Sequence, residues 1–184
     1  YFFPYGLLRN PNLKKSEIYE ALRDEWKGID SPETIIDSLS RYQNAFIDLS
    51  CGTNFQGQTK RIHQLFHNIW ELDAPSSIYP FMMNVSSAIR DKVLSENDGA
   101  EVLQVIESFL VRRAVCGHEP TGLHSVFKRL WVDCGNKPTR DSVIKQLRQH
   151  RTVAWPTIGE FRNAVESRPL YGSGITSYVI LEYD

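Results

Sequence analysis

Two histidines in this sequence have the spacing of a metal-binding pair. His63 and His67 are four residues apart, so one face of a helix would bring their imidazoles together. Zinc enzymes with a His-Glu-x-x-His motif use this spacing, but here Gln64 follows the first histidine and no third ligand is evident. On a helical wheel both histidines lie beside an apolar stripe. We therefore expect a surface pair and no metal site, with a metal-dependent enzyme as the alternative.

Two adjacent arginines lie in the most hydrophobic segment of the chain. On a wheel that starts at Val102, Arg113 falls at about 20°, among the side chains expected in the core, and Arg112 falls on the shoulder of the same stripe. A buried guanidinium needs a carboxylate, backbone carbonyls or an external anion, because an unpaired buried charge costs several kcal/mol. Glu107 lies at about 140° and is not the expected partner. Two interpretations remain open: a structural anchor that joins helices, or part of a groove for phosphate or another domain.

Basic residues concentrate in one part of the chain. Residues 112–151 carry nine basic and three acidic side chains, a net charge of +6, although the whole chain has a net charge of -1. Such a block is a weak electrostatic indication of nucleic-acid binding. The alternative is a solvated face that pairs with acidic residues of the same domain. The candidate DNA-contacting residues are Lys128, Arg129, Arg140, Lys145 and Arg148.

Other chemistry is poorly represented. The three cysteines (Cys51, Cys116 and Cys134) are odd in number, far apart and outside any C-x-x-C motif, which favours a reduced, cytoplasmic setting and small buried side chains. The sequence lacks the glycine-rich phosphate loops, the nucleophile elbow and the zinc-deaminase motif. We therefore expect no catalytic residue, no metal site and no cofactor within this chain.

The elements that would position these residues are helices. Apolar residues recur at helical spacing through most of the chain. Ser31 and Pro32 form a helix start, and Gly52 forms a stop. We predict an all-α fold, an irregular bundle of about seven to nine helices, with Asn97 to Gly99 as a turn. The predicted helices are 16–27, 31–52, 59–72, 78–94, 100–115, 122–132, 139–150 and 157–167, and 175–183 forms either a last helix or a strand.

Composition limits the class of protein. The chain has 184 residues, 41% of them hydrophobic and 23% charged, which is typical of a globular domain. No apolar run is long enough to span a membrane, so we expect no membrane partner. Because the first residue is Tyr1 and the opening residues have no signal-peptide pattern, we expect the chain to be a piece of a longer protein. We predict a helical domain over 1–150 and a further helical segment over 151–184, with packing of the two as one domain as the alternative.

Two stretches resemble a known family. Ile106 to Gly117, followed by Gly122 to Phe127, is similar to the "ies-lvRRaicG…gLn-vF" signature of GmrSD-type proteins, the modification-dependent (type IV) restriction enzymes and their phage-defence relatives. His124 stands where the family often has Asn. A second, looser match resembles the family's segment that leads into its nuclease domain. It comprises Trp155-Pro156, Glu160-Phe161-Arg162, Pro169-Leu170-Tyr171 and Tyr178 to Glu182. The resemblance covers residues 100–184 well and the first hundred only by helical character.

The resemblance implies an architecture. In such a protein a ParB/sulfiredoxin-like domain handles a nucleotide, a helical region follows, and a His-Asn-His nuclease domain cuts DNA with a divalent metal. This chain would be the helical region, with residues 151–184 leading toward the nuclease domain. It has no DGQQR motif and matches no catalytic residue of the family, although Arg112 and Arg113 match its signature. Its expected partners are the flanking domains, and DNA is a candidate partner. A stand-alone helical protein-interaction module is the alternative.

Overall fold

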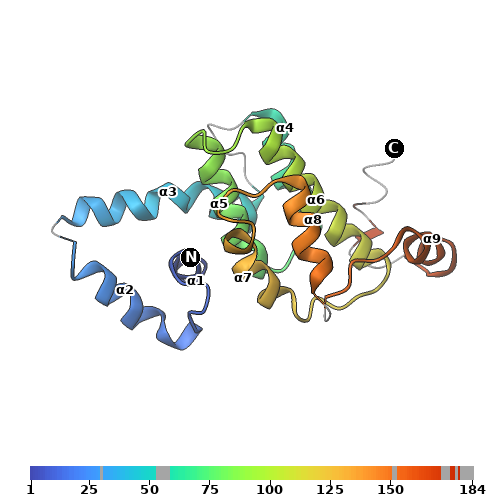
Figure 1. The fold of residues 1–184 in the computed structure, drawn as a ribbon, viewed down its shortest axis with the longest axis horizontal. Helices are drawn as coiled ribbons and strands as arrows, with labels where there is room; N and C mark the ends of the chain where they lie inside the picture. The colour runs from blue at the N-terminus through green and yellow to red at the C-terminus, as the bar shows by residue number, and fades with distance from the viewer. Residues whose placement is uncertain (30, 53–58, 151–152, 171–174, 177, 179–184) are drawn as a thin grey trace.

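The computed structural model describes residues 1–29, 31–52, 59–150, 153–170, 175–176 and 178. Over these residues the protein is helical, with no strand, which confirms the predicted all-α fold. Figure 1 shows the helices. They are α1 (Phe2–Arg9), α2 (Ile18–Trp26), α3 (Pro32–Cys51), α4 (Lys60–Glu71), α5 (Tyr79–Arg90), α6 (Glu96–Val115), α7 (Leu123–Asp133), α8 (Arg140–Gln149) and α9 (Ile158–Ser167), and the short 3-10 helices Lys15–Glu17 and Ser76–Ile78 precede α2 and α5.

Local capping explains where several helices begin. The Thr139 side chain accepts a hydrogen bond from the Ser142 N–H, and the Ser142 side chain accepts one from the Thr139 N–H. Thr157 and Glu160 form the same reciprocal pair at the start of α9. These reciprocal bonds satisfy amide groups that have no partner within the helix. Pro32 opens α3 with Ser31 as its N-cap residue, as predicted, although the Ser31 side chain makes no capping hydrogen bond. The expected starts of α3, α8 and α9 are therefore accurate to within about one residue.

The predicted turn at Asn97 to Gly99 is wrong. These residues form the first turn of α6, where the Ser95 side chain accepts a hydrogen bond from the Asp98 N–H at 3.0 Å. Gly99 allows Ile89 to pack closely on this turn, because an added Cβ would lie 2.4 Å from the Ile89 Cδ1. The break between α5 and α6 falls earlier than predicted, because α5 ends at Arg90 rather than near residue 94.

The ends of the chain also differ from expectation. The aromatic opening was not predicted as helical, yet it forms α1, whose Tyr5 is fully buried. At the other end Ile175, Thr176 and Tyr178 have helical backbone. The other residues of the predicted last element lie outside the described part of the chain.

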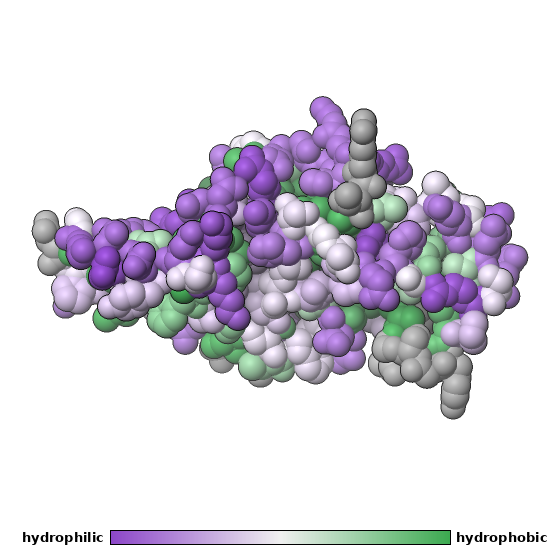
Figure 2. All heavy atoms as spheres, turned by 90° about the horizontal axis from the view of Figure 1, so that it is seen from below, coloured by the Kyte–Doolittle hydropathy of each residue, from purple (hydrophilic) through white to green (hydrophobic). Residues whose placement is uncertain are grey.

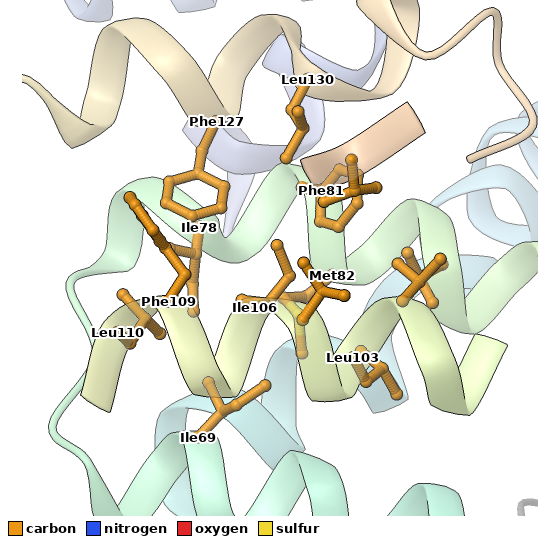
Figure 3. Packing of buried hydrophobic residues seen from close by; sticks show 14 of the residues in the cluster. Ile69, Ile78, Phe81, Met82, Leu103, Ile106, Phe109, Leu110, Phe127 and Leu130 are labelled. Carbon is orange, nitrogen blue, oxygen red and sulfur yellow. The ribbon is translucent and has the colours of Figure 1, made fainter. Parts of the chain in front are cut away.

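The core is built around α6. This helix contacts α4, α5, α8 and α9, and it runs through the body of the molecule in Figure 1. Figure 3 shows its side chains meeting those of α4, α5 and α7. The labelled side chains are Ile69 from α4, Ile78 from the preceding 3-10 helix, Phe81 and Met82 from α5, Leu103, Ile106, Phe109 and Leu110 from α6, and Phe127 and Leu130 from α7. All of them are buried, so burial of apolar surface on α6 is the main stabilising contribution.

A smaller apolar cluster lies at the carboxyl end of α6. Val115 packs there with Ala164 of α9 and with Ile175 and Tyr178 of the tail. The Tyr178 hydroxyl donates to Glu107, which also accepts a bond from the Asn68 side chain at 2.7 Å. Residues beyond 150 are thus attached to the helical body, while the predicted division at residue 150 stays a prediction.

The amino-terminal helices project from this body. In Figure 1, α2 and the first half of α3 extend away from the core, and Figure 2 shows many hydrophilic side chains over that region. The second half of α3 is fastened to α5, because Arg41 donates to Ser87 at 2.8 Å and forms an ion pair with Asp91. None of the helices described is long and apolar enough to cross a bilayer.

Candidate anion-binding groove

A large groove lies beside α6 and α8. Its volume is about 1290 Å³, and its walls are α6, α8, residues 150 and 154–157, and the first turn of α9. We call it the arginine groove because Arg112, Arg140 and Arg148 line it together with His150 and one acid, Glu101. Its other lining residues are Gln104, Val105, Ser108, Ile144, Ala154, Trp155, Pro156, Thr157, Ile158 and Gly159.

Helical periodicity explains how α8 supplies two of the arginines. Arg140, Ile144 and Arg148 follow one another at i, i+4 and i+8, so they lie along one face of the helix. Val143 and Leu147 are fully buried on the neighbouring stripe and hold the helix against the core. This packing fixes which face of α8 lines the groove.

Each groove arginine has a different local environment. Arg112 donates from Nε to the Ser108 hydroxyl at 3.3 Å and lies over the ring of Phe161 at 5.6 Å. Arg148 lies over the ring of Trp155, also at 5.6 Å. Arg140 is 58% exposed and pairs with its neighbour Asp141 at 3.3 Å. For Arg112 and Arg148 there is no carboxylate within ion-pair distance among the described residues.

The amino terminus of α9 contributes shape to the groove but no free anion site. The Glu160 carboxylate accepts hydrogen bonds from the Thr157 N–H at 2.7 Å and from its hydroxyl at 2.8 Å. These bonds hold the pKa of Glu160 below its usual value. Because the carboxylate already occupies this position, the arginines carry the positive charge that an anion would meet.

Arg113 faces the interior beside this groove. It is 5% exposed, and its Nη1 donates to the Ala154 carbonyl at 2.9 Å while its Nη2 donates to the Glu119 carbonyl at 2.6 Å. Its guanidinium also lies 5.6 Å from the centre of the Phe109 ring, and its buried Nε has no hydrogen-bond partner in the described part of the chain. Burial lowers its pKa from the usual value. Arg113 therefore joins the end of α6 to two separate loops.

The structure divides the predicted basic block between surfaces. Arg140 and Arg148 lie in the groove together with Arg112, whereas Lys128, Arg129 and Lys145 are not among its lining residues. Arg129 instead pairs with Asp133 along α7 at 3.6 Å. Arg151, the last basic residue of the block, lies outside the described residues.

Sequence reasoning missed several groove residues. His150, Trp155, Pro156 and Ile158 were not assigned to a site, although Trp155-Pro156 belongs to the stretch with the family resemblance. The segment from 150 to 157 has no periodic pattern that would show its direction. The available signal was an aromatic residue, Trp155, shortly after the proposed basic contact Arg148.

The other candidate residues do not form a site. His63 lies 3.8 Å from Asp48 and His67 lies 3.5 Å from Glu71, so each histidine faces its own carboxylate. Within the described ranges no group of three or more His, Cys, Asp or Glu residues is placed to hold a metal ion. All three cysteines are free thiols, and the expectation that they are buried is wrong: Cys51 is exposed, and Cys116 and Cys134 are only partly buried.

The pair formed by Asp48 and His63 predicts a pH effect on stability. Asp48 is 5% exposed, and burial raises its pKa from 3.8 to about 6, although His63 acts in the opposite direction. A carboxyl whose pKa rises on folding favours the fold most when it is protonated, so its contribution is lost between about pH 4 and pH 6. Asp48→Asn should therefore raise the free energy of unfolding at about pH 7 by about 3 kcal/mol and change it little at about pH 3.5.

Urea unfolding of the Asp48→Asn variant across this pH range would test the effect. Asp37→Asn, an exposed substitution on the same helix, is the matched control and should leave the pH profile unchanged. A variant less stable than the natural protein at neutral pH would show that the Asp48 carboxylate stabilises the fold.

No protein-family model matches the chain, and no curated protein and no solved structure shows significant similarity to it. Function must therefore be inferred from the chemistry of the chain's own residues and from the motif resemblance.

Proposed function

We propose that this chain is the helical middle region of a GmrSD-like DNA restriction or phage-defence endonuclease. It is not catalytic by itself. It holds the nucleotide-handling and DNA-cutting domains in register and contributes a basic surface to DNA. In this proposal the nucleoside triphosphate and the divalent metal act in those other domains, and the protein works in the cytoplasm.

The observation that carries this proposal is the contact made by Arg113. The two stretches that resemble the family are far apart in the sequence, yet Arg113 of the first stretch donates to the carbonyl that precedes Trp155 of the second. It also donates to Glu119, within the loop between the two parts of the first stretch. The loop between the two parts of the first stretch and the residue that precedes the second stretch thus meet at one buried side chain.

The glycines of the first stretch support the same interpretation. Gly117 and Gly122 have φ angles of +69° and +88°, a backbone region that L side chains rarely adopt. At Gly117 an added Cβ would lie 1.6 Å from the Arg168 guanidinium. The positive φ angles favour glycine at both positions, which gives a structural reason for these two residues of the pattern "RRaicG…gL".

Duplex DNA binding tests the proposed function. Fluorescence anisotropy with plain and base-modified duplexes should show affinity that falls steeply with salt, because lysines and arginines displace counterions from phosphates. Reversing the charges of Lys128, Arg129, Arg140, Lys145 and Arg148 together should abolish binding, and each single reversal that removes a phosphate contact should lower the salt slope by about one.

Lys27→Glu is the control for this experiment, since that lysine lies just beyond α2, far along the chain from the basic block. It should leave the affinity unchanged. Absence of duplex binding at low salt would contradict a DNA-facing role.

A protein-interaction module is the second candidate. Exposed apolar side chains on the projecting helices favour it: Tyr19 on α2 is 72% exposed and Ile36 on α3 is 59% exposed. This candidate predicts no affinity for DNA, so the duplex titration separates the two.

A further inference from the structure

The arginine groove has an unbalanced charge. Three arginines and one histidine face a single lining acid, Glu101, and two of the arginines lack an ion-pair partner in the described chain. A groove lined by one sign of charge concentrates ligands of the opposite sign. The preferred ligand is therefore anionic.

The spacing of the arginines requires an extended ligand. Arg140 and Arg148 are eight residues apart on α8, which places their backbones about 12 Å apart along the helix axis. Arg112 belongs to the opposite wall, on α6. A ligand with several negative charges along its length can reach all three arginines.

The remaining lining favours planar, partly apolar groups. Trp155 is held from one side by Phe109, with the two ring centres 5.3 Å apart, and Arg148 lies over its ring. Arg148 is itself exposed, so its planar guanidinium can receive a second ring. Nucleic-acid bases stack on arginine planes and on aromatic side chains in this way. Val105, Ile144 and Ile158 provide apolar contacts nearby.

We propose that the arginine groove binds a single strand of nucleic acid, with phosphates at Arg112 and Arg140 and a base stacked on the pair formed by Arg148 and Trp155. This inference deepens the proposed function, because it assigns a ligand to part of the basic surface. A duplex is a poorer ligand for the groove, since its bases are stacked inside the double helix. An acidic peptide supplies the negative charges but has no bases that could stack in the groove.

Competition among four probes tests the ligand class. They are an oligothymidylate of about 12 nucleotides, the same backbone without bases, a duplex of equal length and an oligoglutamate peptide. We expect the oligothymidylate to bind at least roughly tenfold more tightly than the abasic strand, because each stacked base contributes free energy beyond that of its phosphate. Equal affinity for the abasic strand, or tighter binding of the duplex or the peptide, would overturn the inference.

Two arginine-to-lysine variants separate stacking from charge. Arg148→Lys keeps the positive charge but removes the planar group, so we expect roughly a tenfold loss of affinity for the oligothymidylate and little change for the abasic strand. Arg23→Lys, on α2 and outside the groove lining, is the matched control, because that arginine also lies over an aromatic ring, Tyr19, at 5.8 Å; it should have no effect. Trp155→Phe should weaken stacking while it keeps an aromatic ring. Equal losses in Arg148→Lys and Arg23→Lys would also overturn the inference.

The outcomes distinguish this inference from the proposed function on which it rests. Duplex binding that depends on the basic block, without single-strand binding, would contradict this inference and support the proposed function. Single-strand binding that depends on Arg148, without duplex binding, would support the groove and contradict the duplex-facing surface.

Discussion

Replacing Arg113 with alanine is expected to lower the free energy of unfolding by about 3 kcal/mol. The substitution removes two charge-assisted hydrogen bonds to the carbonyls of Ala154 and Glu119 and leaves a void beside Phe109. For a protein of this size the melting temperature should fall by about 6 to 12 °C. Arg113→Lys should recover only part of the loss, because one ammonium group cannot reproduce the planar guanidinium that donates to two carbonyls.

Arg112→Ala is the matched control for this experiment. The side chain has the same chemistry one residue earlier, but its contacts are a hydrogen bond to Ser108 and a ring contact with Phe161 near the surface. Its removal should cost less than about 1 kcal/mol. Equal melting temperatures for the two alanine variants would show that the Arg113 contacts contribute little.

The same variant separates an anchor from a coupling element. In the longer protein that we propose, an anchor role predicts that Arg113→Ala lowers activity only as far as it unfolds the helical region. A coupling role predicts that activity is lost while the region remains folded. Circular dichroism melting of this chain and nuclease activity of the longer protein would together distinguish these outcomes.

Periodic segments could be predicted well from the sequence. The α6 stripe is long enough for a helical wheel to give the direction of Arg113, and the Thr139 and Thr157 starts follow from side chains that compete for local backbone amides. The turn at Asn97 to Gly99 failed because the same residue types also favour a first helical turn after a serine cap. In the structure the Ser95 side chain caps this turn through the Asp98 N–H, and Gly99 packs closely on Ile89.

The groove could not be predicted in the same way. Its arginines come from two helices, and its aromatic residue comes from a segment without periodicity, so no single window of sequence contains the site. Charge counting grouped residues 112–151 as one block, but helical geometry places Arg148 in the groove and leaves Lys145, three residues earlier, outside it.

Phe109→Ala is expected to have the largest effect on stability, with a loss of about 4 kcal/mol. The side chain is fully buried, and its ring centre lies 6.3 Å from that of Phe127 and 5.3 Å from that of Trp155. Its removal takes away apolar burial and leaves a cavity between α6, α7 and the segment that follows α8. The melting temperature should fall by about 8 to 16 °C.

Phe2→Ala is the control for the Phe109 substitution, because it deletes the same ring from a side chain that is 52% exposed on α1. It should cost less than about 1 kcal/mol. Phe109 also supports Trp155, so a folded Phe109→Ala protein at low temperature should bind an oligothymidylate more weakly than the natural chain. Normal stability of this variant would contradict the packing around α6, whereas reduced stability with undiminished single-strand binding would show that Trp155 keeps its place without Phe109.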